Sequence, residues 1–566
     1  MTTIEARPEA IGNDDRDEEH LRVVIVGAGF SGLSVAARLR EQGEESFAVL
    51  ERGESVGGVW RDNTYPGVAC DAPSHFYSLS FAPNPEWDRS FSSGWRIQEY
   101  LESVASNREL RPWIHLNEEV IDASWDDAAA LWRITTTRQI LNAEILVSCA
   151  GPLTEPIYPD VPGLDSFRGK TFHSNRWDHE HDLSGERVAV VGTGASAVQI
   201  VPAIQPRVEN LVVFQRTPGW VVPRLEREVP EAEKRLLRAF PALVKLYRTK
   251  QFLVRDLLNY RMIRRNSVVR KLFQRESHSL LEKSVSDPEL RAKLTPDYEI
   301  GCKRVLITND FYPALDKPNV ELVASGLREV RGNSVVAADG TEHEMDTIVF
   351  ATGYETTDPT IYKRIRGRDG RYIDEVWSGQ PRFHRATTVA GFPNFFNLCG
   401  PGTGSGHGSM IWKAESQTAY VLDALRKMRE HNLTSVEVRP DAQDRYMQWV
   451  SEDLGETVWA RGGCQSWYLD VGGRPSLMWP RTMWGFRRML RRFDPEHYLL
   501  RPAKPAGHVA PDGTARRPLV RADRLVHSLT SSMSHGLLKA ATSRKGGVQR
   551  LARQLLGRLP TSPFTR

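Results

Sequence analysis

The sequence predicts an α/β fold that contains two doubly wound units and a helical insert. Two segments repeat the same order of buried strand, glycine-rich turn, helix and second strand. These strands and helices are expected at residues 21–26, 31–42 and 47–50, and again at 187–191, 195–204 and 211–214. Further strands are expected at 320–323 and 345–350. Residues 234–275 differ, because their apolar residues follow helical spacing without strand alternation.

The length and composition are those of a globular protein with several domains. The chain has 566 residues, which suggests about three or four domains. Hydrophobic residues make up 40% and charged residues 26%, and the formal net charge is only +4, so the overall charge does not indicate nucleic-acid binding. The N-terminus is polar and acidic, and no apolar run approaches the ~20 residues that span a bilayer. We therefore expect a cytoplasmic protein without a secretory signal.

The cysteines are isolated from one another along the chain. They are Cys70, Cys149, Cys302, Cys399 and Cys464, and no two are spaced as C-x-x-C. This pattern argues against a disulfide framework, a zinc ribbon and a dithiol redox pair. The sequence therefore predicts reduced cysteines, as in a reducing compartment, and no metal site.

These patterns divide the chain into five parts. We expect a disordered N-terminus at 1–20, a first nucleotide-binding domain at 21–155 and 386–500, a second at 156–225 and 300–385, a helical insert at 226–299, and a basic, mostly disordered tail at 501–566. Residues 503–566 carry twelve Lys or Arg residues against two Asp residues. The composition of the tail, rich in Pro, Gly and Ser, is typical of disorder.

The first glycine-rich turn has the pattern of a dinucleotide site. Gly27, Gly29 and Gly32 form G-x-G-x-x-G between a strand and a helix, where backbone can approach a pyrophosphate. Glu51 ends the next strand, where a carboxylate can accept hydrogen bonds from ribose hydroxyls. A turn without a ligand is the alternative, and the strand, helix and acid together argue against it.

A second glycine turn after Glu51 favours an extended FAD as the ligand of this site. Gly57 and Gly58 form that turn. Residues 351–354 are expected to return to the flavin, and residues 400–402 form another glycine turn before a helical stretch. The candidate FAD-binding residues are Gly27, Gly29, Phe30, Ser31, Gly32, Glu51, Gly58, Val59, Trp60, Asp71 and Tyr77.

The second glycine-rich turn predicts NADPH. Gly192, Gly194 and Ala197 form G-x-G-x-x-A, and Arg216 follows the next strand where an NAD enzyme would carry an acid. The planar guanidinium suits a 2′-phosphate, although a solvated surface arginine is the alternative. The candidate residues here are Gly192, Thr193, Gly194, Ala195, Ser196, Arg216 and Thr217.

Two longer motifs resemble one family. Phe167, Gly169, His173, Trp177 and Asp178 fit F-x-G-x-x-x-H-x-x-x-W-D, which is similar to the fingerprint of the type I Baeyer–Villiger monooxygenases of the flavin-containing monooxygenase superfamily. A second family pattern, G-x-W-x-x-x-x-Y-P-G-x-x-x-D, matches Gly58, Trp60, Tyr65, Pro66, Gly67 and Asp71. The resemblance covers roughly residues 22–500.

The resemblance implies an active site and a reaction. It places the catalytic pair on Asp71 and Arg304, phosphate-binding cations on Lys303 and Arg216, and a tryptophan of a mobile loop over the nicotinamide on Trp467. His173 has a structural role in the family. FAD, NADPH and dioxygen would insert an oxygen atom beside a ketone carbonyl through a flavin peroxide, giving an ester or lactone. Arg304 would stabilise the peroxyanion, and Asp71 would orient Arg304.

Other functions stay open at this point. A flavin-dependent N-hydroxylase or S-oxygenase would use the same fold, and so would a non-oxygenating flavin reductase. The expected partners are a small-molecule ketone of unspecified type and dioxygen, with no nucleic acid, in a monomer or small homo-oligomer. The basic residues of 234–275 and the helical spacing of 548–559 allow weak contact with an anionic membrane, against the plainer interpretation of a solvated basic surface.

Overall fold

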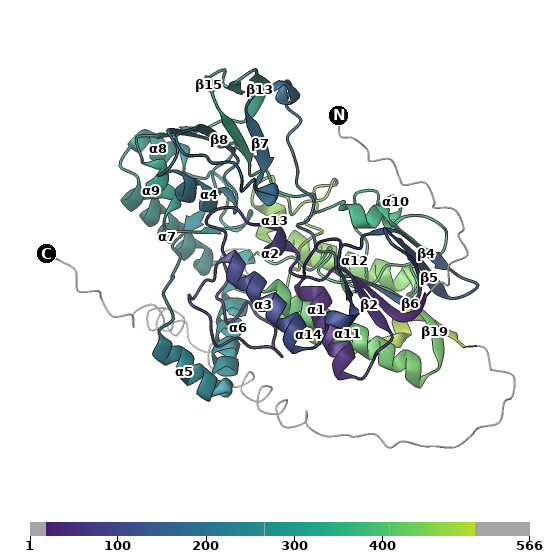
Figure 1. The fold of residues 1–566 in the computed structure, drawn as a ribbon. Helices are drawn as coiled ribbons and strands as arrows, with labels where there is room; N and C mark the ends of the chain where they lie inside the picture. Colours follow the sequence, from purple (N-terminus) through teal and green to yellow (C-terminus); the bar gives the residue numbers. More distant parts are fainter. Residues whose placement is uncertain (1–18, 265–266, 407, 504–566) are drawn as a thin grey trace, which may run out of the picture. The chain divides into compact units, whose positions relative to one another are not determined.

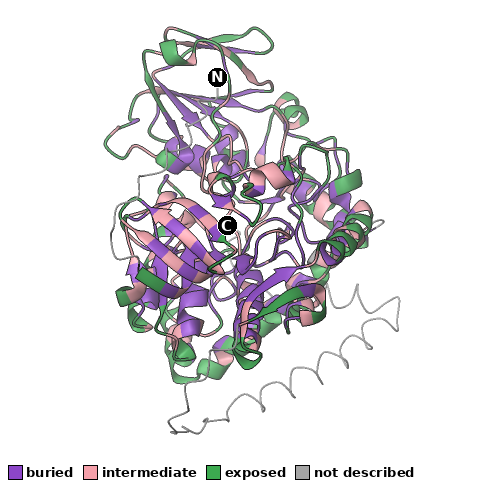
Figure 2. Cartoon of the chain, turned by 90° about the vertical axis from the view of Figure 1, so that its right-hand side faces the viewer, coloured by how far each residue is buried: buried purple, intermediate pink, exposed green. Residues whose placement is uncertain are grey.

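The computed structural model describes residues 19–264, 267–406 and 408–503 (Figure 1). Two sheets of mainly parallel strands form its centre. The strands are mostly buried, whereas exposed residues concentrate on the outer helices and loops (Figure 2). The expected amphipathic run at 548–559 and most of the expected disordered termini lie outside the described residues. No helix in the described part of the chain is both long and apolar enough to cross a bilayer.

The first sheet has the strand order β17-β4-β5-β6-β1-β2-β3, with β18 beside β6. Its strands are β1 (Glu19–Val26), β2 (Phe47–Leu50), β3 (Ile114–His115), β4 (Val120–Asp126), β5 (Leu131–Thr136), β6 (Ile140–Ser148), β17 (Ile365–Arg366) and β18 (Phe395–Asn397). The strands β2, β1, β6 and β18 are parallel, while β4, β5 and β6 pair antiparallel. Helices α1 (Phe30–Glu41), α3 (Gly94–Asn107) and α11 (Met410–Glu430) contribute to the apolar core on this sheet.

The second sheet is fully parallel, with the order β12-β9-β8-β16-β7. Its strands are β7 (Lys170–His173), β8 (Arg187–Val191), β9 (Asn210–Phe214), β12 (Val320–Val323) and β16 (Thr347–Phe350). Buried residues of α4 (Ala197–Ile204) and α9 (Phe311–Leu315) share a core with it. The strands β13 (Leu327–Arg331), β14 (Ser334–Ala337) and β15 (Glu342–Glu344) form a separate antiparallel sheet. The predicted α/β fold with two doubly wound units is confirmed.

Helices occupy the segment that the sequence marks as an insert. They are α5 (Glu231–Ala239), α6 (Pro241–Ile263), α7 (Val268–Ser284) and α8 (Pro288–Lys293). Asp256 on α6 accepts hydrogen bonds from the backbone N–H groups of Met483 and Trp484, at 2.6 and 3.2 Å. These residues begin α14 (Met483–Met489), so the carboxylate supplies acceptors to a helix N-terminus.

The last part of the described chain packs on the first unit. It contains α12 (Pro440–Gly455), α13 (Val458–Arg461) and the antiparallel pair of β19 (Leu433–Val438) with β20 (Tyr498–Pro502). Strand β20 extends beyond residue 501, where the sequence predicts the tail. Strand β1 begins inside the predicted N-terminal tail because Glu19 and His20 pair with β6. The sequence predicts that the chain re-enters the first nucleotide-binding domain at residue 386. It does so earlier, at β17, because Ile365 and Arg366 pair with β4 of the first sheet.

The cysteine prediction is wrong for one pair. Cys302 and Cys464 form a disulfide across 162 residues of sequence. Spacing rules detect cysteines that are neighbours in the chain, and this pair is brought together only by the fold. Cys70, Cys149 and Cys399 are buried free thiols, as expected.

Candidate active site

The turn between β1 and α1 forms an open cradle. A Cβ on Gly32 would lie 1.8 Å from the carbonyl oxygen of Gly27, so only glycine lets the helix approach the strand this closely. A Cβ on Gly29 would have no contact nearer than the Cα of Gly58, at 3.8 Å. The two glycine turns therefore face each other and leave room beside bare backbone. Amide groups at the start of α1 are suited to bind a phosphate group in this space.

Glu51 is held rigidly at the end of β2. The residue is buried, and its carboxylate accepts hydrogen bonds from the backbone of Ala28 and Gly53, both at 2.8 Å. Arg61 Nη1 donates to the same carboxylate at 2.6 Å. A carboxylate has about four acceptor positions. Glu51 therefore retains acceptor capacity for a ribose hydroxyl.

One cavity brings most of the predicted FAD residues together. It is lined by Gly27, Gly29, Phe30, Ser31, Glu51, Gly58, Val59 and Tyr77, among others. Trp60 adjoins them, because its indole Nε1 lies 3.2 Å from the hydroxyl oxygen of Tyr77. The rings of Phe30 and Tyr77 pack edge to face at 5.3 Å.

The same cavity includes residues that the sequence reasoning missed. They include residues 149–155 after β6, Thr360, Ile361 and Arg364 before β17, and Cys399, Met410, Ile411 and Ala414. The carboxyl ends of β6 and β1 lie side by side in the sheet. A sequence argument could have found the first group, since ligands bind at the carboxyl ends of parallel strands.

Residues 351–354 lie elsewhere than expected. They follow β16 of the second sheet and do not line this cavity. A Cβ on Gly192 would lie 2.6 Å from the carbonyl oxygen of Ala351, so the segment borders the second glycine turn. The hydroxyl of Tyr354 donates to Asn63 Oδ1 at 2.6 Å and so contacts the first unit. The segment joins the two units and does not return to the flavin cradle.

Two cations converge at the carboxyl edge of the second sheet. The turn of Gly192, Thr193, Gly194, Ala195 and Ser196 after β8 is partly or fully exposed, and Arg216 follows β9. Burial and the charge of Arg216 lower the pKa of Lys303. Within the described residues, neither Arg216 nor Lys303 forms an ion pair with a carboxylate. Thr217 is half-buried beside Arg216. The edge is thus suited to a ligand that carries a phosphate.

Asp71 and Arg304 form the predicted pair. Nε and Nη2 of Arg304 donate to one carboxylate oxygen of Asp71 at 2.9 and 2.5 Å. The Asp71 charge raises the pKa of the guanidinium above its ordinary value, against the effect of burial. The two side chains are 33% and 28% exposed, so the pair is accessible to a small molecule. Arg304 directly follows Lys303, while Asp71 follows the Gly58 turn, so the pair joins the two nucleotide units.

Trp467 and Tyr468 lie on a loop that reaches Arg304. Tyr468 is fully buried, and burial raises the pKa of its phenol to about 12, partly offset by the charge of Arg304. Trp467 is 46% exposed, and its ring contacts Tyr468 at 4.5 Å. The structure therefore places Tyr468 beside Arg304 and leaves Trp467 at the surface. Sequence reasoning selected Trp467 alone.

The long fingerprint lies along β7. A Cβ on Gly169 would lie 2.1 Å from the carbonyl oxygen of Asp346, so this position requires glycine. His173 is buried, and its Nδ1 accepts a hydrogen bond from the backbone of Asn175 at 3.1 Å. Burial lowers the pKa of His173 to about 4. A neutral, enclosed imidazole supports the structural role expected of it.

Comparisons with known proteins agree with this geometry. The family model described as flavin-binding monooxygenase-like matches residues 20–368. A Baeyer–Villiger monooxygenase of Streptomyces coelicolor is 51% identical over 86% of this chain and 94% of its own length. One of Pseudomonas aeruginosa is 45% identical over 85% and 92%.

Solved structures of similar proteins show the same fold. A cyclohexanone monooxygenase from Rhodococcus sp. Phi1 bound to NADP⁺ is 28% identical, has a TM-score of 0.76, and is matched over 86% of this chain and all of its own. A steroid monooxygenase bound to NADP is 27% identical, with a TM-score of 0.75 over the same shares. The resemblance seen in the motifs is confirmed, and the chain belongs to the flavin-binding monooxygenase-like family, among its Baeyer–Villiger monooxygenases.

Proposed function

We propose that this protein uses FAD, NADPH and dioxygen to insert one oxygen atom beside a ketone carbonyl, giving an ester or lactone. The Asp71–Arg304 ion pair carries the proposal, because it places a permanent cation where the two nucleotide units meet. Relatives named Baeyer–Villiger monooxygenase and neighbours solved with FAD and NADP support it.

The first cradle is the FAD site. Gly29 and Gly58 leave space for the pyrophosphate, and Glu51 keeps a free acceptor position for the ribose. Bound flavin supplies two-electron chemistry and activation of dioxygen. Phe30, Ser31 and Tyr77 form part of the wall of its cavity.

The second cradle is the NADPH site. The exposed turn at Gly192–Ser196 offers backbone N–H groups to the pyrophosphate. Arg216 and Lys303 bind the 2′-phosphate, whose charge relieves the repulsion that lowers the pKa of Lys303. Both cations lack carboxylate partners in the described part of the chain, so the phosphate displaces no ion pair.

Arg304 acts where negative charge develops on oxygen. The Asp71 charge raises the pKa of the Arg304 guanidinium, so this group stays charged at neutral pH. Asp71 holds that guanidinium through two hydrogen bonds to one oxygen, which fixes its direction. Tyr468, buried beside Arg304, keeps water from one side of the guanidinium, and Trp467 completes the closure when it moves inward from its surface position, which strengthens the electrostatic interaction.

Product identity tests the reaction. Purified holoenzyme with NADPH and ¹⁸O₂ is offered linear, cyclic, aromatic and steroid ketones, with a tertiary amine and a thioether as separate arms. Mass spectrometry should find an ester or lactone that contains one ¹⁸O atom. Oxygenated amine or thioether without any ester would favour the N-hydroxylase or S-oxygenase alternative. NADPH consumption with hydrogen peroxide as the sole product in every arm would contradict an oxygenase function.

We also propose weak contact with an anionic membrane surface through the insert. Helix α6 exposes Leu246, Leu253 and Leu257, and the same helix carries the exposed cations Lys245 and Lys250. Such a surface suits the interface of a bilayer and gives access to lipophilic ketones. Sedimentation with phosphatidylserine vesicles should retain the protein at low salt and release it at high salt. Lack of salt-sensitive binding would leave the solvated-surface interpretation.

The remaining expectations are proposals of the same kind. We propose a cytoplasmic protein that is a monomer or small homo-oligomer, with the sequence-based domain boundaries adjusted so that β1, β17 and β20 stay with the first nucleotide-binding domain. Sedimentation velocity measures the oligomeric state. Fractionation of cells that express the tagged chain tests the location.

A further inference from the structure

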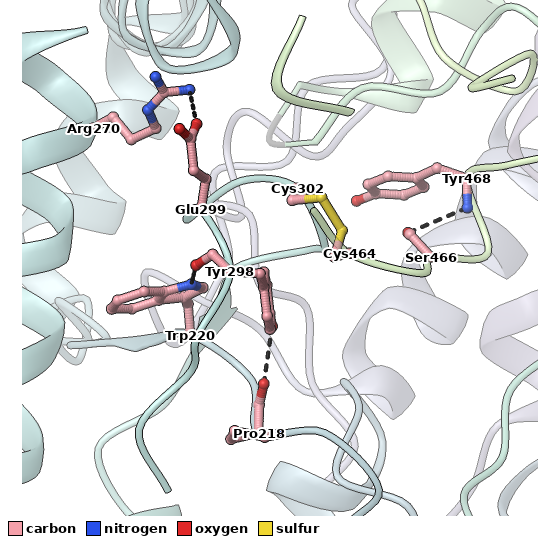
Figure 3. Close-up of a disulfide and its surroundings, with 9 residues drawn as sticks. All are labelled: Pro218, Trp220, Arg270, Tyr298, Glu299, Cys302, Cys464, Ser466 and Tyr468. Atoms are coloured by element: carbon pink, nitrogen blue, oxygen red, sulfur yellow. Dashed lines mark hydrogen bonds and ion pairs between the residues drawn. A yellow bond between two sulfur atoms is a disulfide. The ribbon is translucent and has the colours of Figure 1, made fainter. Parts of the chain in front are cut away.

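The segment that carries Arg304 is anchored firmly on one side. The hydroxyl of Tyr298 donates to the carbonyl oxygen of Pro218, and Trp220 Nε1 donates to the carbonyl oxygen of Tyr298, both at 2.9 Å. Arg270 on α7 pairs with Glu299 at 2.9 Å. These contacts fix Tyr298 and Glu299, at the start of this segment, to the second nucleotide unit and to the helical insert (Figure 3).

The loop of Trp467 and Tyr468 contacts the other side of this segment. The backbone N–H of Glu299 donates to the carbonyl oxygen of Gly462 at 3.1 Å. A Cβ on Gly462 would lie 2.8 Å from both Cβ and Sγ of Cys302, so the loop backbone lies directly against that cysteine. The disulfide joins Cys302 to Cys464 at this place (Figure 3).

The positions of the two cysteines relate the disulfide to the active site. Cys302 lies two residues before Arg304, and Cys464 lies three residues before Trp467. Around Trp467, the loop forms a 3.4 Å hydrogen bond from Thr356 Oγ1 to the Trp467 carbonyl oxygen, and the neighbouring Tyr468 is buried in the core. Without the disulfide, the first part of the loop would be held to residues 298–304 by one hydrogen bond and by packing.

We propose that Cys302 and Cys464 are positioning residues whose disulfide holds the Trp467–Tyr468 loop against Arg304, and that reduction by a dithiol uncouples NADPH oxidation from oxygenation. The inference rests on the proposed monooxygenase function. With the loop released, water reaches the oxygen-activating site, and reducing equivalents from NADPH leave as hydrogen peroxide.

The burial of the two cysteines determines which sulfur atom a reductant attacks first. Cys302 is fully buried and Cys464 is half-buried, so a dithiol reaches Cys464 first. A thiolate of the dithiol attacks Cys464 Sγ, the protein S–S bond breaks, and Cys302 leaves as a thiolate that is then protonated. The second thiol resolves the mixed disulfide, so the dithiol becomes a disulfide and the protein gains two electrons and two protons. Disulfides of this kind in a reducing compartment are commonly regulatory.

Thiol counting tests the bond itself. Holoenzyme unfolded without reductant and treated with a maleimide should be labelled at the three free cysteines, and at all five after reduction. Labelling of all five without reductant would refute the disulfide and the proposal with it.

Activity measurements test the positioning role. Wild-type holoenzyme is reduced with dithiothreitol, desalted, and assayed for ester, NADPH oxidised and hydrogen peroxide. A misplacement of ~1 Å can cost about 10²-fold, so we expect about a tenfold lower ester yield per NADPH and a higher KM for NADPH, with FAD retained. Reoxidation should restore both values.

The double variant Cys302→Ser/Cys464→Ser is the matched control. It should resemble the reduced wild type and be unaffected by dithiothreitol, which excludes effects at the other thiols. Wild-type coupling in this variant, or loss of FAD on reduction of the wild type, would overturn the positioning role. If no ketone yields an ester even with the oxidised wild type, the proposed function fails. The thiol count and the KM for NADPH then still test whether the Cys302–Cys464 disulfide holds the loop.

Discussion

Replacing Arg304 by alanine should separate NADPH oxidation from ketone oxygenation. Hydride transfer depends on the geometry of the two nucleotides, whereas oxygenation also needs a cation near the oxygen on which negative charge develops. Arg304→Ala should therefore bind FAD and oxidise NADPH, but release hydrogen peroxide in place of ester. Asp71→Ala should fail in the same direction, because Asp71 directs the guanidinium through hydrogen bonds at 2.5 and 2.9 Å.

The size of the effect follows from the charge and its surroundings. At an effective dielectric constant of about 20, unit charges ~4 Å apart interact by about 4 kcal/mol. Arg304 is one-third exposed and already paired with Asp71, so its net contribution lies below that value. Loss of one preorganised donor typically costs about 10²–10³ in rate, or about 2.7–4 kcal/mol. We therefore expect about a hundredfold lower rate of ester formation.

The assay is ester formed per NADPH oxidised, with catalase-sensitive peroxide measured in parallel. Arg304→Lys keeps the charge but loses the planar fork, and should be intermediate at best. Arg366→Ala is the matched control, because Arg366 pairs with Asp122 at 2.6 Å with comparable exposure, 38% and 22%. Wild-type coupling in Arg304→Ala on a true substrate would refute the assignment of the catalytic cation.

Three further predictions concern the cofactor sites and stability. Arg216→Ala should raise the KM for NADPH and leave that for NADH nearly unchanged, since only the 2′-phosphate contact is lost; equal losses in steady-state assays would place that contact elsewhere. Gly29→Trp should purify without flavin absorbance because the indole fills the space facing Gly58, whereas Gly29→Ala adds only a Cβ to the same space and should weaken FAD binding less. His173 has its pKa lowered to about 4 when folded, so the unfolded chain binds more protons between about pH 6.5 and 4 and stability falls as pH falls through that window. His173→Gln should remove up to about 3 kcal/mol of this pH dependence, and unchanged pH profiles of chemical denaturation would show that His173 does not titrate as assigned.

Local sequence patterns were sufficient to predict the strands, helices and turns that form the two dinucleotide sites. Strand β8 has the bounds that apolar residues between turns predict, and α1 begins within one residue of the expected position. The glycine turn at Gly27–Gly32 has a specific pattern because close backbone approach excludes other residues. Arg304 and Asp71 were placed by resemblance, and the structure brings them together, although their catalytic roles stay predictions.

Local sequence patterns could not predict the contacts between segments that lie far apart in the chain. The Cys302–Cys464 pair spans 162 residues, so no spacing rule could detect it. Tyr468 was overlooked in favour of Trp467, because a sequence does not show which of two adjacent aromatic side chains points inward. Residues 351–354 were assigned to the flavin although β16 belongs to the other sheet, since strand order is set by tertiary pairing.

The order of strands in the first sheet bears on how the chain is made. Strands β17 and β18 join that sheet from positions after the whole second sheet, which uses only residues between 170 and 350. During synthesis on the ribosome, the second sheet therefore has all its strands while the first still lacks two. The usual order, in which the N-terminal domain is the first to have all its strands synthesised, is reversed here. A nascent chain stalled after β16 would hold a complete second sheet, and a first sheet with the place beside β6 left for β18 still exposed.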